Sequence, residues 1–150
     1  MRYIYIFIIF LFSCEKEDSI EQNLFEFLIG KVYETRSSSS GDFWNNGTEI
    51  NGNMFVQFPE TTNDWLEWNL FYIKDGEEDC LFRWAYTQDM YGLQNIINTP
   101  NELQVNGVYG QVWFFTKTSK NQLEVKYMNG TIPLKLELKN NKEFLELNCN

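Results

Sequence analysis

The thiols and the missing histidines limit the chemistry that this chain can perform. Its 150 residues include three cysteines, at positions 14, 80 and 149, and no histidine. Without an imidazole, the Ser-His-Asp and Cys-His nucleophile systems, the usual general base and the common zinc ligand are all excluded. No glycine-rich phosphate loop and no CxxC pair occur. The sequence therefore predicts a protein that is not an enzyme and that uses no metal or cofactor.

Carboxylates are the remaining groups that could do chemistry. Glu49 and Glu67 lie close to tryptophans in the sequence, and paired carboxylates can hydrolyse glycosides. The stretch 74–80, KDGEEDC, places four acids in a short loop whose oxygen atoms could hold calcium. The spacing of an EF-hand is absent, however, and Asp75-Gly76 is itself a turn signal. We interpret 74–80 as a solvated hairpin tip, and the two glutamates as ordinary members of an acid-rich chain.

Cys14 stands at the end of an apolar leader. The leader carries one positive charge, Arg2, followed by apolar or aromatic residues throughout 3–12 and then a serine. This order is typical of a secretory signal peptide. The apolar run is shorter than the roughly 20 residues that a transmembrane helix needs. We therefore predict a signal peptide at 1–13 and no permanent transmembrane helix there.

The four residues Leu11-Phe12-Ser13-Cys14 resemble the lipobox of bacterial lipoproteins. The resemblance implies that the Cys14 thiol is lipidated, with acyl chains such as palmitate, and that the peptide bond before it is cut. The next residues, EKED at 15–18, resemble an export signal to the surface of the outer membrane, and they also fit an ordinary charged tether. These resemblances imply a lipidated tether at 14–19 and a cell-envelope location, at the outer membrane and surface-exposed. The partner they imply is the membrane, through the lipid anchor.

The acidic charge excludes one large class of partners. The net charge is −9, and residues 42–102 hold eleven acids but only two bases, Lys74 and Arg83. An acidic chain is repelled by phosphate backbones, so we predict no nucleic-acid binding. If Cys14 carries lipid, Cys80 and Cys149 remain as a pair, and an exported protein permits a disulfide between them. Two separate buried thiols are the alternative.

A two-residue period governs most of the chain beyond Gly30. In TIPLKLELK (131–139), leucines and an isoleucine alternate with polar residues, as in a half-buried strand. Asn-Gly and Asp-Gly steps suit tight hairpin turns. Residues 20–29 have helical spacing instead, so we predict a short helix there. Residues 88–101 show no clean period, so we predict a long loop, with a helical turn within it as an alternative. The predicted strands are 31–37, 53–58, 65–74, 80–87, 103–106, 109–117, 122–128, 131–139 and 143–148.

Short strands joined by tight turns indicate an all-β antiparallel meander with a short N-terminal helix. Eight or nine strands are about the number that closes, or nearly closes, into a small barrel, and closure removes exposed edges. A two-sheet sandwich is the rival architecture. The order of helix, LIGKVYE, hairpins and NQLEVKYMNGTIPLKLELK resembles the lipocalin-like domains of small bacterial lipoproteins. This resemblance implies a single lipocalin-like β domain over 20–150, with a ligand cavity in some members.

Aromatic rings are the candidate binding groups. Alternation predicts that one set points inward and could line a pocket for a small hydrophobic ligand, namely Trp68, Tyr72, Phe82, Trp84 and Tyr86. The same rings could instead simply fill the barrel. Three other rings, Trp65, Phe71 and Trp113, are predicted to face outward. The sequence thus favours a non-enzymatic, membrane-anchored lipoprotein that binds a small hydrophobic molecule or serves as a structural envelope component. The alternative is a surface carbohydrate-binding or adhesion module with a β-sandwich fold.

Overall fold

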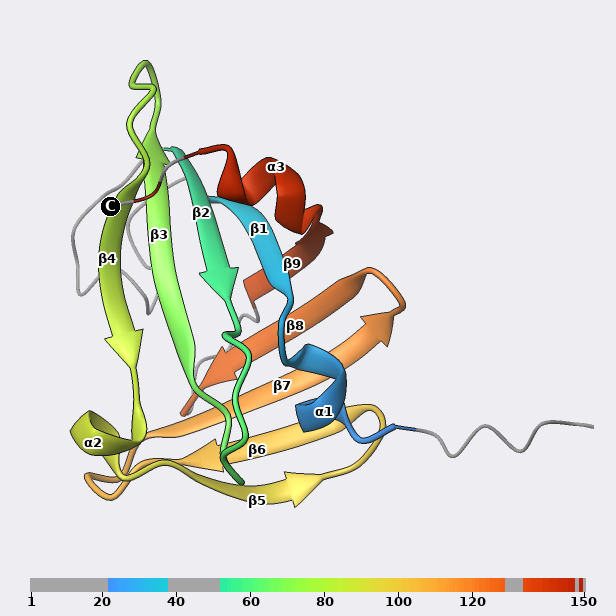
Figure 1. Ribbon diagram of the computed structural model, residues 1–150. Helices are drawn as coiled ribbons and strands as arrows, with labels where there is room; N and C mark the ends of the chain where they lie inside the picture. The colour runs from blue at the N-terminus through green and yellow to red at the C-terminus, as the bar shows by residue number, and fades with distance from the viewer. Residues whose placement is uncertain (1–21, 38–51, 129–133, 148, 150) are drawn as a thin grey trace, which may run out of the picture.

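The computed structural model describes residues 22–37, 52–128, 134–147 and 149, and these form an all-β domain with three short helices (Figure 1). The strands are β1 (Val32–Ser37), β2 (Gly52–Gln57), β3 (Trp68–Lys74), β4 (Leu81–Tyr86), β5 (Gln94–Asn98), β6 (Glu102–Asn106), β7 (Val112–Ser119), β8 (Gln122–Tyr127) and β9 (Leu134–Lys139). The helices are α1 (Leu24–Leu28), α2 (Gln88–Tyr91) and α3 (Asn141–Leu145). The predicted fold class, an antiparallel meander, is confirmed.

All nine strands belong to one antiparallel sheet, in the order β4-β3-β2-β1-β9-β8-β7-β6-β5. Strands that follow one another in the chain pair with each other, except for β4 and β5, which are the two ends of the sheet. The pairing of β1 with β9 joins the first four strands to the last five. The sheet curls strongly into a half-barrel, so that β5–β8 cross beneath the upright strands β1–β4 (Figure 1). Helix α2 lies at the corner where the chain passes from β4 to β5.

Two apolar clusters occupy the two faces of the curled sheet. The inner cluster contains Trp68, Trp113 and Phe115 together with aliphatic side chains from α1, β2, β3, β6, β8 and β9. The outer cluster is smaller and joins Phe55 and Phe71 to Phe144 of α3, with ring centroids of Phe144 5.7 and 5.4 Å from theirs. Because α3 covers this strip, the strands β2 and β3 carry buried residues on both faces.

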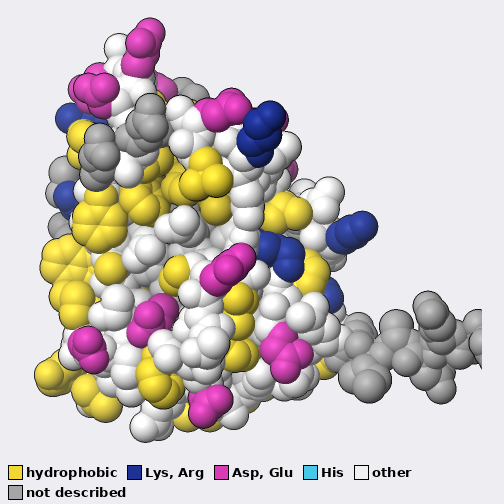
Figure 2. Space-filling view, in the orientation of Figure 1, with side chains coloured by type: hydrophobic (Ala, Val, Ile, Leu, Met, Phe, Trp, Pro, Cys, Tyr) yellow, Lys and Arg dark blue, Asp and Glu magenta, His cyan; other side chains and the backbone are white. Residues whose placement is uncertain are grey.

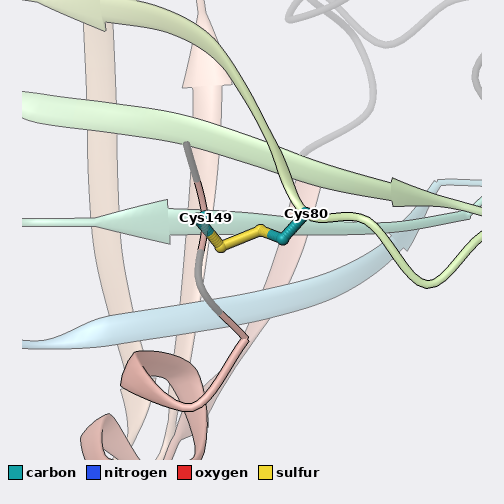
Figure 3. Close-up of a disulfide and its surroundings, with 2 residues drawn as sticks. All are labelled: Cys80 and Cys149. Atoms are coloured by element: carbon teal, nitrogen blue, oxygen red, sulfur yellow. A yellow bond between two sulfur atoms is a disulfide. The ribbon is translucent and has the colours of Figure 1, made fainter.

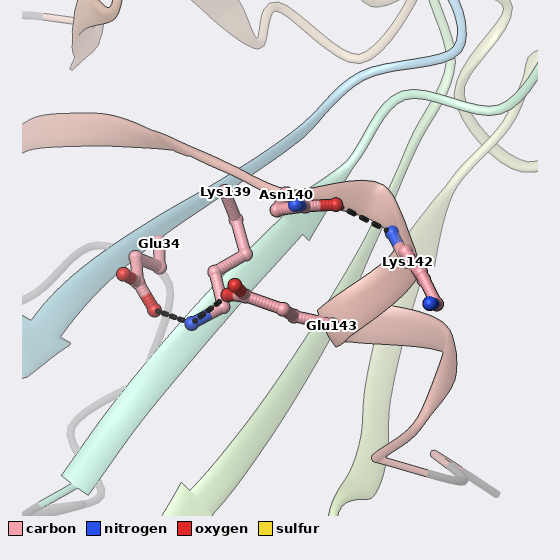
Figure 4. Close-up of polar contacts among 5 residues, drawn as sticks. All are labelled: Glu34, Lys139, Asn140, Lys142 and Glu143. Carbon is pink, nitrogen blue, oxygen red and sulfur yellow. Dashed lines mark hydrogen bonds and ion pairs between the residues drawn. The ribbon is translucent and has the colours of Figure 1, made fainter.

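Helix α3 replaces the strand that the sequence predicted over 143–148, so that prediction was wrong. The Asn140 side chain accepts a hydrogen bond from the Lys142 N–H at 2.9 Å, which caps the helix. Lys139 also lies 3.3 Å from Glu143 and 3.4 Å from Glu34 of β1 (Figure 4). Burial lowers the Lys139 pKa, but the hydrogen bonds to Glu143 and Glu34 and their charges outweigh it, so the pKa is raised.

Two further predictions differ from the structure in extent. The helix predicted over 20–29 is α1, which begins at Leu24 within the described residues and is followed by Gly30 at φ +75°. The segment 88–101 contains α2, which matches the helical turn that the prediction allowed, and the strand β5, which was missed. Most β5 side chains are exposed, so the strand shows no apolar alternation that the sequence could reveal.

Candidate functional site

Two of the predicted inward rings, Trp68 and Tyr86, pack within the inner cluster. Trp68 is fully buried and stacks on Tyr86, with ring centroids 4.9 Å apart and an interplanar angle of 19°. Trp113 and Phe115 of β7 meet Trp68 edge to face at 5.1 and 5.3 Å. Such contacts are typical of a filled aromatic core. Trp68 and Tyr86 therefore lie on the predicted face, but they fill space there.

Trp113 was predicted to face outward, and this was wrong. It is 1% exposed and lies among Trp68, Tyr86, Tyr91 and Tyr127. The strand β7 carries rings on both faces, with Phe114 38% exposed on the opposite side. Alternation alone therefore could not identify the inward face of this strand. Pairing does, because Trp113 is opposite Val105 and Tyr127, which belong to the inner cluster.

A β-bulge in β4 separates two rings that the sequence placed together. Leu70 is opposite Trp84, whereas its neighbour Phe71 is opposite Phe82, so Arg83 is the extra residue. Phe82 therefore shares the outer face with Phe71, with ring centroids 5.6 Å apart, and its prediction as an inward ring was wrong. Trp84 stays on the inner face but projects from the end of the sheet and is 42% exposed.

The other rings named from the sequence are partly or wholly buried against neighbouring elements. Tyr72 is half-buried opposite Met54 of β2 and Leu81 of β4. Phe71 does face outward, but it is only 8% exposed because α3 covers it. Trp65 is half-buried against the inner cluster, so it does not form an exposed platform.

Glu67 serves the fold at the β4–α2 corner. Its Oε1 accepts hydrogen bonds from Trp65 Nε1 at 3.1 Å and from the Gln88 backbone N–H at 2.8 Å. The carboxylate thus fixes the start of α2. The other glutamate considered as a catalytic group, Glu49, lies outside the described residues, as do Cys14 and the leader.

The acidic loop is an exposed hairpin tip, as predicted. Residues 74–79 are exposed, Gly76 has φ +83°, and Lys74 lies 3.6 Å from Glu77. Within the described ranges, no group of three or more histidine, cysteine or acidic side chains is arranged to hold a metal ion.

A polar hollow of about 600 Å³ lies across β1, β2, β7, β8 and β9. Its described lining includes Glu34, Glu124 and Glu137, and the rings predicted to bind a ligand do not contribute to it. Glu34 is paired with Lys139 at 3.4 Å and Glu124 with Lys135 at 3.9 Å. Of these four side chains only Lys135 is mostly exposed, and the two pairs already engage the Glu34 and Glu124 carboxylates.

The most unusual surface of the described domain is apolar and follows β4 into α2. Five side chains define this β4–α2 edge, with exposed fractions from 42% to 76%: Phe82, Trp84, Met90, Val108 and Tyr109. Figure 2 shows hydrophobic side chains gathered over β4 and α2, at the left of the view. Exposed apolar groups that cluster in this way mark interaction surfaces more often than isolated ones do.

Hydrogen bonds and close packing hold the edge in place. Trp84 Nε1 donates to the Tyr91 hydroxyl at 2.8 Å, which joins β4 to α2. The Val108 N–H donates to the Tyr91 carbonyl at 2.8 Å, and a Cβ on Gly92 would lie 2.6 Å from the Val108 side chain. Gly92 has φ +56° and ends α2 in the left-handed conformation. Of the five edge residues, Met90, Val108 and Tyr109 were missed from the sequence, because α2 and the β6–β7 loop show no periodic pattern.

The cysteine pair predicted from the sequence is brought together. Cys80, just before β4, and Cys149, beyond α3, stand in disulfide-bonding position with Cα atoms 4.5 Å apart (Figure 3). Cys80 is 3% exposed and belongs to the outer cluster. The pair therefore holds the C-terminal segment, including α3, against the outer face of the sheet.

No helix among the described residues has the length and apolar character that crossing a membrane requires. No protein-family model matches the chain, and comparisons with curated proteins and with solved structures likewise find no match.

Proposed function

We propose that this chain is an exported, lipid-anchored protein of the cell envelope, not an enzyme, that acts through contacts made by its outer surface. The observation that best supports this proposal is the packing of Trp68 against Tyr86, Trp113 and Phe115 in the inner cluster. A carrier of small hydrophobic molecules needs a preformed cavity. Rings that fill the barrel favour the structural and interaction role over the carrier role.

The anchor belongs to the same proposal. The apolar leader and the lipobox-like residues before Cys14 support lipidation at that thiol. Labelled fatty acid is expected to enter the wild-type protein and not the Cys14→Ala variant, which should stay uncleaved or be released from the membrane. Equal labelling of the two proteins would contradict the anchor.

The filled core is tested by truncating its central ring. Trp68→Ala is expected to lower the free energy of unfolding by about 3–5 kcal/mol, the usual loss for a large aromatic in a packed core. The wild type should bind apolar dyes with no defined stoichiometry. Urea unfolding and fluorescence titration measure the two quantities. A small stability loss together with stoichiometric dye binding would overturn the surface role and restore the carrier role.

A further inference from the structure

We infer that the β4–α2 edge is a docking site for a cationic, amphipathic segment of another protein. This inference rests on the surface role proposed above and names the class of partner. The edge residues are the exposed side chains Phe82, Trp84, Met90, Val108 and Tyr109. Trp84, Met90, Val108 and Tyr109 supply the apolar contact area that a partner segment would cover, and Phe82 adjoins it from the other face of β4.

The polar atoms of the edge favour a peptide over a sugar. A carbohydrate site combines a ring face with hydrogen-bonding groups that converge on the sugar hydroxyls. The indole N–H of Trp84, however, is already donated to the Tyr91 hydroxyl at 2.8 Å. The Trp84 ring is therefore held in a fixed orientation and offers mainly apolar surface.

Charge around the edge selects a basic partner. The acids Glu77, Glu78 and Asp79 precede β4 directly and are exposed, and Asp89 is exposed on α2. At and beside the edge, five exposed acids (Asp75, Glu77, Glu78, Asp79 and Asp89) outnumber two bases, Lys74 and Arg83, of which Arg83 lies within β4. Lysines or arginines flanking an apolar stripe would meet complementary charge, which speeds association and favours the correct partner. A second copy of this acidic chain would bring like charges together.

The position of the edge argues against lipid as its occupant. Helix α1, where the described chain begins, lies on the opposite side of the domain from β4 and α2 (Figure 1). The proposed anchor precedes α1, so the chain enters the domain on the side remote from the edge. An anionic lipid surface would also be repelled by the acids beside the edge.

The test uses the full chain in detergent and a labelled synthetic helix that carries leucines and tryptophan on one face and lysines on the other. Saturable binding is expected, and Trp84→Ala should weaken it at least tenfold. Phe114→Ala is the matched control, because Phe114 is a similarly exposed ring, on β7. Thermal unfolding of each variant identifies loss of fold. Trp84→Phe, which keeps a ring, should retain most of the affinity.

The second part of the test changes the charges of the edge and of the helix. Asp89→Asn combined with Glu78→Gln should weaken binding and reduce its salt dependence, while a glutamate version of the helix should bind at least tenfold less tightly. Equal binding of the two helices, equal loss in Phe114→Ala, or no binding by the wild type would overturn the inference. So would saturable binding of anionic vesicles, or self-association through Trp84 in ultracentrifugation. If the core is found solid and Cys14 lipidated, any of these results leaves the surface role standing and removes only this partner class.

Discussion

Tyr33 is a buried tyrosine whose surroundings disfavour ionisation of its hydroxyl group. It is 1% exposed, and its ring meets Phe58 edge to face at 5.9 Å. Burial raises the pKa of its hydroxyl to about 12, because the phenolate is disfavoured away from water. Burial likewise raises the pKa of Tyr86, with help from Tyr91 and Tyr127.

The raised pKa predicts loss of stability in alkali. An unfolded tyrosine ionises near pH 10, whereas folded Tyr33 holds its proton to about pH 12. Its contribution is present in full below pH 10 and is lost as the pH rises to about 12, a change of roughly 2–3 kcal/mol. Tyr33→Phe removes this titration, so its urea midpoint should fall less steeply over that window. Parallel profiles for the two proteins would contradict the assignment.

The rings show how far single residues could be placed from sequence. Alternation placed Trp68, Tyr86 and Trp84 on the inner face, as the structure has them. It failed for Phe82 because the bulge at Arg83 reverses the face, and one inserted residue leaves no mark in a strand rich in rings. Alternation also could not distinguish a ring that lines a cavity from a ring that fills the core, since this depends on the size of the side chains on the facing strand.

At the scale of elements, α3 acts as a cover over an apolar strip of the sheet. Phe144 is 4% exposed and packs on Phe55 and Phe71, which would otherwise meet solvent. One sign of this helix is visible in the sequence, because Asn140 is followed three residues later by Glu143, the spacing of a helix cap and its acid. The leucines at 145 and 147 imitate a strand, and the short helix was missed for that reason.

Removing the Phe144 ring is expected to cost stability in proportion to its burial. Phe144→Ala should lower the free energy of unfolding by about 3 kcal/mol or more, since a buried ring is replaced by a cavity or by solvent. Leu145→Ala is the control on the same helix, because Leu145 is 70% exposed and should change stability by less than about 0.5 kcal/mol. Urea unfolding measures both variants. Equal effects would mean that α3 does not cover the sheet.

At the scale of the whole molecule, the cysteine pair ties the C-terminal segment to the sheet. Cys80 and Cys149 are 69 positions apart in the sequence, and a crosslink over that loop contributes about 4 kcal/mol in the chain-entropy account. A Cys80→Ser, Cys149→Ser double variant should unfold at lower urea than the wild type, and a reductant should shift only the wild type. Two titratable thiols in exported Cys14→Ser protein, denatured without reductant, would refute the bridge.

The pairing of β1 with β9 also sets when the domain can be completed. Val32 finds its partner Lys139 only after almost the whole chain has become available, whereas the β2–β3 and β7–β8 hairpins need only neighbouring residues. Contacts so distant in sequence are slow to form. A chain delivered N-terminus first must therefore keep β1 open on one side until β9 arrives. For the proposed export, such a delay would keep the polypeptide unfolded enough to pass a narrow translocation channel, and the arrival of β9 would complete the sheet on the far side.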